Sequence, residues 1–364
     1  MKKICIILLS TLVLLAACGG GGTGSPRESI DLALITDIGT VDDKSFNQGS
    51  WEGLLQYALE HNISHRYFQP PEQSDDSYLT TIDLAVRGGA KLIVTPGFLF
   101  AVPIFHAQER YPDVNFVLLD ATPHNGDWGA GPIFRTDRNT VGVLYAEDQA
   151  GFLAGYAAVM DGYRRLGFMG GMAVPAVVRF GYGFVQGAEY AARELNLPAG
   201  TITINYHYTG GFQATPAVQT MAASWYNAGI EVIFACGGAL GNSVMAAAEQ
   251  IGRSVIGVDI DQADESPTVI TSAMKNLRGS VYDSITAFYA GAFPGGQTKV
   301  FDAANNGIGL PMATSKFRTF SQADYDAIFA ALASGRIPRM LDDPDAAGSP
   351  SIVPVTISVV TEIQ

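Results

Sequence analysis

The two halves of this 364-residue chain repeat the same features in the same order. The segment 89–97 reads GAKLIVTPG, and 23 residues after its end Asp120 closes a second apolar run, NFVLLD. In the other half the segment 229–237 reads GIEVIFACG, and 22 residues after its end Asp259 closes the run VIGVD. Such self-similarity at nearly equal spacing indicates two lobes that share one topology.

A second match precedes the first in each half. The segment 46–53 reads FNQGSWEG and the segment 180–187 reads FGYGFVQG, so both carry the pattern F-x-x-G-x-x-x-G. Each copy is predicted to follow a strand and to open a helix. One such coincidence could arise by chance, whereas two in the same order favour a duplicated architecture.

Short apolar runs alternate with amphipathic stretches from Ile30 onward. Trp51, Leu54, Leu55 and Ala58, for example, have the i, i+3, i+4, i+7 spacing of one helix face. Strands that alternate with helices predict an α/β fold with parallel sheets covered on both faces. The runs predicted to be buried strands are 30–36, 90–96, 114–120, 164–170, 201–208, 231–237, 254–260 and 268–274.

The charge of the chain restricts its partners. Only 22 Lys and Arg face 35 Asp and Glu, which gives a formal net charge of −13 at pH 7. Binding to nucleic acid requires clustered cationic side chains that neutralise phosphates, so no nucleic-acid partner is expected. A neutral sugar or nucleoside suits this balance better than a phosphorylated ligand. The length favours two hydrophobic cores over one.

The N-terminus predicts export. Lys2 and Lys3 precede the apolar run ICIILLSTLVLLAA, which ends before Cys18 and is too short for a comfortable membrane span. The alternative is an uncleaved anchor helix. The residues LAAC at 15–18 resemble a bacterial lipobox, which implies a signal peptide at 1–17 and a lipidated Cys18. The following GGGGTGSP predicts a flexible tether over 18–29.

The expected mature protein is thus a body held by lipid on the outer face of a plasma membrane or in a periplasm. Cys5 leaves with the signal peptide and Cys18 carries lipid, so only Cys236 remains and no intramolecular disulfide is possible. An exported chain with a core of this size does not need one.

The ends of the predicted strands indicate where a ligand binds. In open parallel sheets, ligands bind beyond the carboxyl ends of the strands, and two such lobes facing each other form a common cleft. Phe46 and Phe180 occupy equivalent positions in the two halves, so their rings could stack on both faces of a flat ligand. The residues at strand ends are Asp37, Gly97, Asp120, Gly237 and Asp259.

An enzymatic alternative starts from the stretch TDIGTVDDKSFNQ at 36–48, which contains Asp37, Asp42 and Asp43. Nucleoside hydrolases bind calcium through a similar D-x-D-x-x-x-D-D stretch. Here Ile35 replaces one carboxylate and the spacing is one residue too long, which is serious for an ion that needs 6–8 oxygens. Asp42 and Asp43 are better explained as residues that stabilise the start of a helix.

Other catalytic motifs are missing from the sequence. It contains neither a G-x-x-x-x-G-K-[ST] phosphate loop nor a G-x-S-x-G nucleophile elbow, and no G-x-G-x-x-G follows the first strand. Cys236 is interpreted as a small buried residue rather than a nucleophile. We therefore expect no catalytic residue, no metal site and no cofactor, and a binding protein rather than an enzyme.

Six stretches together carry a family resemblance. They are TDIGTVDDKSFNQGSWEG, DLAVRGGAKLIVTPGF, NFVLLDA, GGMAVPAVVRFGYGF, ACGGALGNSV and GVDIDQ. They closely resemble the basic membrane protein family, also called PnrA-like or TmpC-like lipoproteins, from about Ile30 to at least Lys275. The resemblance implies a type I periplasmic-binding-protein fold, with two Rossmann-like lobes, three crossovers and a ligand cleft between the lobes.

The same resemblance implies a function. Family members are substrate-binding lipoproteins of ABC transporters, and characterised ones bind purine nucleosides such as inosine, guanosine and adenosine. Their partners are a permease and an ATPase, and a monomer is expected. A nucleoside- or sugar-sensing lipoprotein would have the same sequence features, so that alternative stays open.

The resemblance also assigns individual roles. It implies that Phe46 and Phe180 sandwich the base and that Gly237 brings backbone close to the ligand. The side chains implied to make polar contacts are Asp37, Asn47, Asp120, Asp259 and Lys275. We expect the first lobe to comprise 30–141 and 276–305, and the second lobe 142–275 and 306–364.

Overall fold

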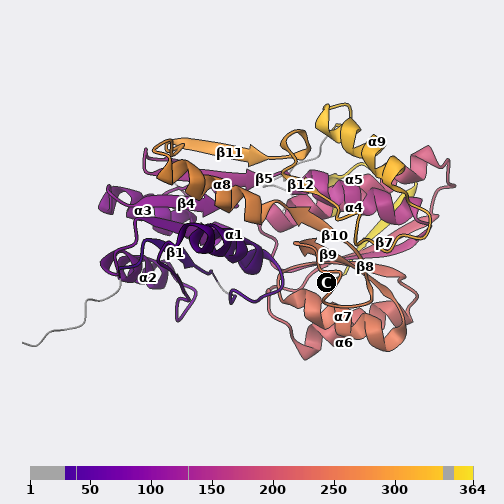
Figure 1. Cartoon of the computed structure of the whole chain (residues 1–364). Helices are drawn as coiled ribbons and strands as arrows, with labels where there is room; N and C mark the ends of the chain where they lie inside the picture. Colours follow the sequence, from indigo (N-terminus) through magenta and orange to yellow (C-terminus); the bar gives the residue numbers. More distant parts are fainter. Residues whose placement is uncertain (1–28, 38, 130, 339–347, 364) are drawn as a thin grey trace, which may run out of the picture.

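The computed structural model describes residues 29–37, 39–129, 131–338 and 348–363. It consists of two lobes, each built on one sheet with helices on both faces (Figure 1). The predicted signal peptide at 1–17, Cys18 and all but the last residue of the predicted tether lie outside the described residues. Within the described ranges, no helix has the length and apolar character needed to cross a membrane.

The first lobe contains a six-stranded sheet in the order β11-β5-β4-β3-β1-β2, in which every pairing is parallel. Its helices are α1 (Phe46–His61), α2 (Asp75–Arg87), α3 (Ala101–Arg110) and α8 (Leu277–Tyr289), and a short 3-10 helix, η1 (Phe98–Phe100), precedes α3. Its strands are β1 (Leu32–Ile35), β2 (His65–Phe68), β3 (Leu92–Pro96), β4 (Asn115–Leu119), β5 (Thr140–Tyr145) and β11 (Gln297–Phe301).

Alternate residues of each strand face opposite sides of this sheet, as the two-residue period of a strand requires. Leu32 and Leu34 join the core cluster that includes Leu54 of α1, whereas Ala33 and Ile35 join a second cluster beneath α2 and α3. Both faces are thus buried, which explains why the central strands read as continuous apolar runs.

The second lobe contains a seven-stranded sheet in the order β12-β10-β9-β8-β6-β7-β13, and only β12 is antiparallel to its neighbour. Its helices are α4 (Glu147–Met160), α5 (Pro175–Glu194), α6 (Pro216–Asn227), α7 (Leu240–Ile251) and α9 (Gln322–Ala333), with the short helices η2 (Ala303–Asn305) and η4 (Pro350–Ile352). Its strands are β6 (Arg165–Gly170), β7 (Ile202–Tyr208), β8 (Val232–Cys236), β9 (Ser254–Asp259), β10 (Val269–Lys275), β12 (Ile308–Gly309) and β13 (Ser358–Glu362).

All eight strands predicted from the apolar runs are present, within two residues of the predicted ends. The prediction lacked β2, β5, β11, β12 and β13. Four of these are edge strands, and the side chains of β2 and β11 are largely exposed. Such strands have less apolar character, because one side of an edge strand meets solvent or a loop rather than a neighbouring strand.

Over the described elements, the chain passes between the two sheets three times, as the family resemblance implied. The passages lie between β5 and α4, between β10 and α8, and between β11 and β12. The hydroxyls of Tyr145 and Ser280 hydrogen-bond at 2.5 Å, and Oε1 of Gln149 accepts the backbone N–H of Ala303 at 2.8 Å. These bonds link the first passage to the other two. We propose that the lobes hinge here, near the predicted lobe boundaries.

The glycines of the repeated F-x-x-G-x-x-x-G pattern allow helices to pack closely. A Cβ at Gly53 would collide with the backbone of Arg278 in α8, and a Cβ at Gly187 would collide with the backbone of Phe152 in α4. In each lobe, then, the helix that carries the repeated pattern packs on the helix that directly follows a passage between the sheets: α1 packs on α8, and α5 packs on α4. One expectation was wrong: α1 begins at Phe46, but α5 begins five residues before Phe180.

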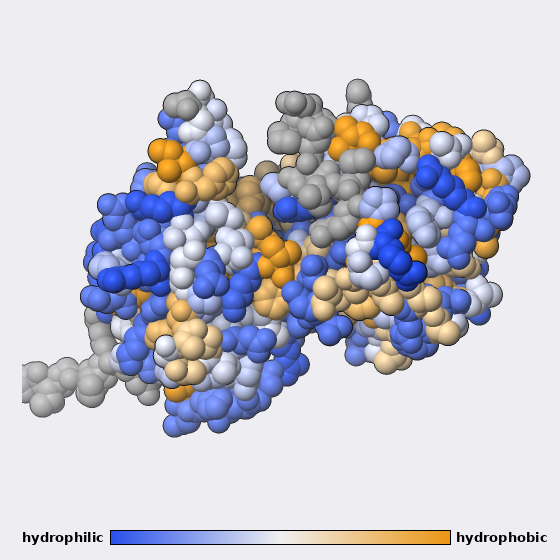
Figure 2. Space-filling model, turned by 90° about the horizontal axis from the view of Figure 1, so that it is seen from above, coloured by the Kyte–Doolittle hydropathy of each residue, from blue (hydrophilic) through white to orange (hydrophobic). Residues whose placement is uncertain are grey.

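One face of the molecular surface is largely hydrophilic. Figure 2 shows that hydrophilic side chains cover most of the face seen from above, while apolar ones form small separate patches. Scattered exposed apolar residues of this kind are normal for a folded protein in water.

Candidate ligand-binding site

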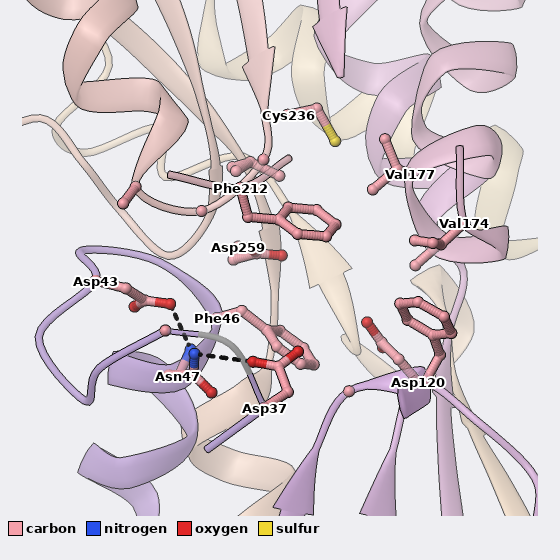
Figure 3. Close-up of a pocket in the computed structure, with 18 of the residues that line it drawn as sticks. Asp37, Asp43, Phe46, Asn47, Asp120, Val174, Val177, Phe212, Cys236 and Asp259 are labelled. Atoms are coloured by element: carbon pink, nitrogen blue, oxygen red, sulfur yellow. Dashed lines mark hydrogen bonds between the residues drawn. The ribbon is translucent and has the colours of Figure 1, made fainter. Parts of the chain in front are cut away.

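A cavity of about 300 Å³ lies where the carboxyl ends of strands from both sheets meet (Figure 3). A cavity of this size lies at the lower end of the range for small-molecule sites. It is lined by all eight residues that the sequence assigned to a site, namely Asp37, Phe46, Asn47, Asp120, Phe180, Gly237, Asp259 and Lys275. The strand-end rule selected five residues, all of which line the cavity, namely Asp37, Gly97, Asp120, Gly237 and Asp259.

The loop after β1 arranges the first side of the cavity. Nδ2 of Asn47 donates to Oδ1 of Asp37 at 3.3 Å, as Figure 3 shows. Gly97 has a positive φ of 117°, and a Cβ there would lie 2.5 Å from Oδ2 of Asp37. The glycine at the end of β3 is therefore required both for its backbone conformation and for the space that Asp37 occupies.

Asp43 organises the start of α1, as predicted. Its carboxylate accepts the backbone N–H groups of Ser45, Asn47 and Gln48 at 2.9–3.0 Å. Burial raises the pKa of Asp43, and the three N–H donors oppose this rise. Asp42 is exposed. Because backbone donors occupy the Asp43 carboxylate, it has little capacity left for a metal ion.

Asp120 and Asp259 occupy equivalent places in the two lobes. Asp120 follows β4 and Asp259 ends β9, and each has left-handed backbone, with φ of 63° and 69°. Asp is one of the few side-chain-bearing residues that tolerate this conformation. The symmetry that the sequence repeat suggested therefore extends to the backbone conformation of these two residues.

A single ammonium joins these carboxylates. Nζ of Lys275 lies 2.6 Å from Oδ2 of Asp120, 3.2 Å from Oε1 of Glu147 and 3.9 Å from Oδ1 of Asp259. Burial alone would lower the pKa of Lys275, but the three carboxylates outweigh it and raise the pKa above its ordinary value. Lys275 is therefore charged at neutral pH.

The carboxylates outnumber this cation, so they are harder to ionise. Burial raises the pKa of Asp120 to about 7, with the charge of Glu147 adding to the rise and Lys275 opposing it. Burial likewise raises the pKa of Asp259, although Lys275 and the Ser45 hydroxyl favour its ionised form. Asp120 and Asp259 are therefore protonated more readily than an exposed aspartate.

Among the residues that the structure describes, two buried oxygens of the cavity wall have no hydrogen-bond partner, namely Oδ1 of Asp120 and Oδ1 of Asn47. An unsatisfied buried acceptor destabilises a protein, so such atoms in a cavity indicate a ligand that donates to them. The arrangement thus selects for a molecule with N–H or O–H groups at its edge.

Among the described residues, four phenylalanines line the cavity: Phe46, Phe98, Phe180 and Phe212. Phe46 is partly buried, and Nζ of Lys275 lies 4.8 Å from its centroid. The Phe180 side chain is only 2% exposed, and its ring packs edge-on against Phe234 with centroids 5.8 Å apart. Because α5 begins five residues before Phe180, this ring lies inside the helix rather than at its first residue, and it is nearly fully buried.

Phe212 was missed from the sequence. It lies in the loop between β7 and α6, and Figure 3 shows its ring extending into the cavity from the side opposite Phe46. The signal was available, because Phe212 follows the predicted strand 201–208 and stands at the same edge as the other strand-end residues.

The rest of the wall is mostly apolar, with Val174, Val177 and Phe98 among its residues. Cys236 also lines it, and burial raises the pKa of this thiol well above its ordinary value. A thiol that stays protonated is a poor nucleophile, which agrees with the interpretation of Cys236 as a small buried residue.

Contacts between the lobes close the cavity on one side. The Ser45 hydroxyl donates to Oδ2 of Asp259 at 2.6 Å, and Nε2 of Gln262 donates to the backbone carbonyl of Lys44 at 2.6 Å. Nζ of Lys44 also lies 3.6 Å from Oε1 of Glu265. The loop of the first lobe thus lies directly on the second lobe. In the described ranges, no cluster of three or more His, Cys, Asp or Glu side chains could hold a metal ion.

Comparisons with known proteins agree with this architecture. Residues 30–333 match the family model described as ABC transporter substrate-binding protein PnrA-like. The ABC transporter nucleoside-binding protein BmpA of Lactococcus lactis is 29% identical, covering 87% of this chain and 94% of that protein. Basic membrane protein A of Borreliella burgdorferi is 32% identical, covering 76% of each.

Solved structures give the same picture. An ABC transporter solute-binding protein from Aeropyrum pernix has a TM-score of 0.67 at 26% identity, over 88% of this chain and 84% of that one. One from Conexibacter woesei has a TM-score of 0.66 at 23% identity, over 86% of this chain and all (100%) of that one, and supports the fold alone. The fold is that of type I periplasmic binding proteins.

Proposed function

The chain belongs to the PnrA-like family of ABC transporter substrate-binding proteins, and on that premise we propose that it captures purine nucleosides (inosine, guanosine or adenosine) in this cavity. Substrate-binding proteins of ABC importers act outside the cytoplasm and deliver a ligand to a membrane permease. The name of the Lactococcus relative, a nucleoside-binding protein, supports the choice of ligand.

One observation carries the proposal: two acceptors without partners among the described residues lie beside aromatic rings in the same cavity. The base would lie between Phe46 and Phe212, whose rings reach the cavity from different lobes. Its N–H groups would donate to Oδ1 of Asn47 and Oδ1 of Asp120, the two acceptors that lack partners. Phe180, the ring assigned from the sequence, would form the wall beside the base, and Asp37 would orient Asn47.

The sugar would lie on the side of Asp259 and Lys275. A carboxylate can accept hydrogen bonds from two vicinal hydroxyls, and an ammonium can donate to a sugar oxygen. Gly237, at the end of β8, would let backbone approach the ligand. Asp37, Asp43, Asp120 and Asp259 line the cavity with Lys275, and this predominance of carboxylates would repel a phosphate and favour the neutral nucleoside.

We propose further that the ligand leaves chemically unchanged. Neither the protonated thiol of Cys236 nor the carboxylate of Asp43, held by three backbone N–H groups, is suited to attack it. Prolonged incubation of inosine or guanosine with pure protein, with and without Ca²⁺, is expected to return intact nucleoside. Release of free base in stoichiometric or greater amount would favour a hydrolase instead.

Attachment to the membrane through a lipidated Cys18 is also proposed, from the LAAC stretch and the glycine tether. Mass analysis of protein extracted from membranes should find a diacyl or triacyl cysteine as the N-terminus. An intact signal peptide, or a cut elsewhere without lipid, would contradict this. An ABC permease and its ATPase would then be the partners in the membrane, and genes adjacent to this one would separate transport from sensing.

The decisive test is calorimetry of the purified chain from residue 19 onward with a panel of inosine, guanosine, adenosine, uridine, ribose and inosine monophosphate. We expect one-to-one binding of purine nucleosides that is much tighter than binding of ribose or the monophosphate. Phe212→Ala provides a control that should weaken every nucleoside but not change any binding of free ribose. Tight binding of ribose with no gain from a base would instead make this a sugar-binding protein.

A further inference from the structure

Glu147 lies behind the cavity and does not line it. It is the first residue of α4, directly after the first crossing between the sheets, and its side chain is fully buried. Its Oε1 lies 3.2 Å from Nζ of Lys275. Isolated buried carboxylates are costly, so a buried glutamate needs a compensating charge.

The other oxygen of Glu147 has a cation of its own. Oε2 lies 3.0 Å from Nε of Arg179, whose side chain is 15% exposed and lies in the second turn of α5. Charges therefore alternate along one line, from Arg179 through Glu147 and Lys275 to Asp120. The row runs from a core helix of the second lobe to the strand end of the first.

Glu147 differs from the other carboxylates around Lys275 in one respect. Asp120 and Asp259 line the cavity, so a bound ligand competes with the ammonium for their oxygens. Glu147 is shielded from the ligand, so its attraction to Lys275 stays the same in the free and bound states. Its position at a helix N-terminus also favours a charged carboxylate.

We propose that Glu147, supported by Arg179, is a positioning residue that holds the Lys275 ammonium charged and aimed at the ligand. When the ligand takes over hydrogen bonds from Asp120 and Asp259, the ion pair with Glu147 keeps the ammonium from moving or losing its proton. This inference rests on the proposed function in one respect: it assumes that the cavity binds a neutral ligand with hydroxyl groups.

A purely structural role, in which Glu147 only fastens α4 to α5, makes a different prediction. It would change stability and leave the chemistry of Lys275 unaffected. The two roles are separated by a double-mutant cycle with Lys275 and by a direct measurement of the lysine itself.

The experiment compares Glu147→Gln, Lys275→Met and the double variant by calorimetry with inosine. Glu147→Gln alone should weaken binding by roughly tenfold or more, because Lys275 loses a buried ion pair. In the Lys275→Met background it should weaken binding by less than about twofold, because its effect passes through the lysine. Additive losses, or wild-type affinity of Glu147→Gln, would overturn the proposal.

Glu189→Gln is the matched control. Glu189 is also buried, on α5, and its carboxylate pairs with Arg193 at 2.9 Å and accepts the backbone N–H of Ser358, away from the cavity. It should lower stability and leave inosine affinity unchanged. If Glu147→Gln does not fold, Glu147→Asp replaces it. This variant keeps the charge but moves it away from Lys275 by one methylene group, so it should still weaken inosine binding. Wild-type affinity of Glu147→Asp would refute the proposal.

A second readout needs no ligand. Carbon-13 NMR of labelled lysine in the free protein should show that Glu147→Gln lowers the pKa of Lys275, while Glu189→Gln leaves it unchanged. An unchanged pKa in Glu147→Gln would rule out the positioning role even if nucleosides bind. Conversely, a lowered pKa in a protein that binds no nucleoside would refute the proposed function and retain the positioning role.

Discussion

Nζ of Lys275 lies 2.6 Å from Oδ2 of Asp120, and this ion pair connects the two lobes at the cavity. Lys275 ends β10 of the second sheet, and Asp120 follows β4 of the first. The Lys275 side chain is 2% exposed and that of Asp120 is 9% exposed, so solvent screens the pair little. A ligand that inserts between the lobes therefore meets a site whose charges already span them.

Lys275→Met should destabilise the free protein strongly at high pH and less at low pH. It leaves Asp120, Glu147 and Asp259 without their shared cation, and removing one partner of a buried pair costs about 3–5 kcal/mol. Because burial raises the pKa of Asp120 to about 7, acidification neutralises the orphaned charge. Urea denaturation at about pH 8 and about pH 5.5 measures the difference.

Lys91→Met is the control for that substitution. Lys91 pairs with Asp31 at 2.7 Å, but its side chain is 60% exposed, and surface pairs of this kind contribute at most about 1 kcal/mol. It should therefore change stability little at either pH. Equal losses for Lys275→Met at both pH values would contradict the assignment of unbalanced charge.

The Asp120 carboxyl should make both stability and binding depend on pH near neutrality. Its pKa of about 7 in the folded protein exceeds the ordinary value of 3.8, so between these values the native state binds more protons than the unfolded state. This group therefore lowers the free energy of unfolding as pH rises from about 4 to about 7. A ligand that donates to the ionised carboxylate should release a proton near pH 7.

Calorimetry of inosine binding in two buffers with different ionisation enthalpies measures that proton. The apparent binding enthalpies should differ near pH 7 in the wild type and agree in Asp120→Asn. Identical enthalpies in the wild type would show that Asp120 does not change its protonation on binding.

Asp259→Ala should remove discrimination between ribose and deoxyribose. Hydrogen bonds to a charged group contribute about 1.5–3 kcal/mol each, so losing those from two hydroxyls should weaken inosine binding by about 2–4 kcal/mol, roughly thirty- to thousandfold. The wild type should favour inosine over 2′-deoxyinosine, and the variant should bind them nearly alike. Retained discrimination would place the ribose elsewhere.

Phe46→Ala supplies the contrast, since stacking on the base does not involve the sugar. It should weaken inosine and 2′-deoxyinosine by the same factor and keep the preference between them. A selective loss of one ligand would contradict the position of the base beside Phe46.

Phe212→Ala and Phe180→Ala should separate binding from folding. The Phe212 ring reaches into the cavity from a loop, so its loss should weaken nucleoside binding by about 1–3 kcal/mol with little change in stability. Phe180 is 2% exposed in the core, so its truncation should lower the free energy of unfolding by about 3–5 kcal/mol. Calorimetry and denaturation of both variants test this, and the reverse pattern would restore Phe180 as the stacking ring.

Ligand binding should close the lobes about the three crossings. The contacts of Ser45 with Asp259 and of Lys44 with Gln262 form across the cleft, so ligand can enter only when they open. Small-angle scattering should show a smaller radius of gyration of the wild type when inosine is added. At an inosine concentration too low to saturate Phe46→Ala, the radius of gyration of that variant should not change. An unchanged profile at saturation would mean that the free protein is already closed.

The positions of most buried strands and of the strand-end residues followed from the sequence, whereas the buried strand β5 was not predicted. Both are local properties, since a buried parallel strand must be apolar on both faces and its carboxyl end must meet the ligand edge of the sheet. The repeat also related Asp120 to Asp259 by their spacing, and both residues have the same left-handed backbone. The family resemblance added Asn47 and Lys275, which periodicity alone does not single out.

The tertiary structure decided which groups act on one another. Lys275 and Asp120 are 155 residues apart, and the role of Glu147 depends on the crossing that places it behind that pair. The repeat treated Phe46 and Phe180 as equivalents, yet α1 starts at Phe46 whereas α5 starts five residues before Phe180. Phe180 therefore lines the cavity as a nearly fully buried ring, and Phe212 also reaches the cavity from a loop. Sequence patterns report the environment along a single element, whereas the charges and rings of this site meet only where separate elements pack.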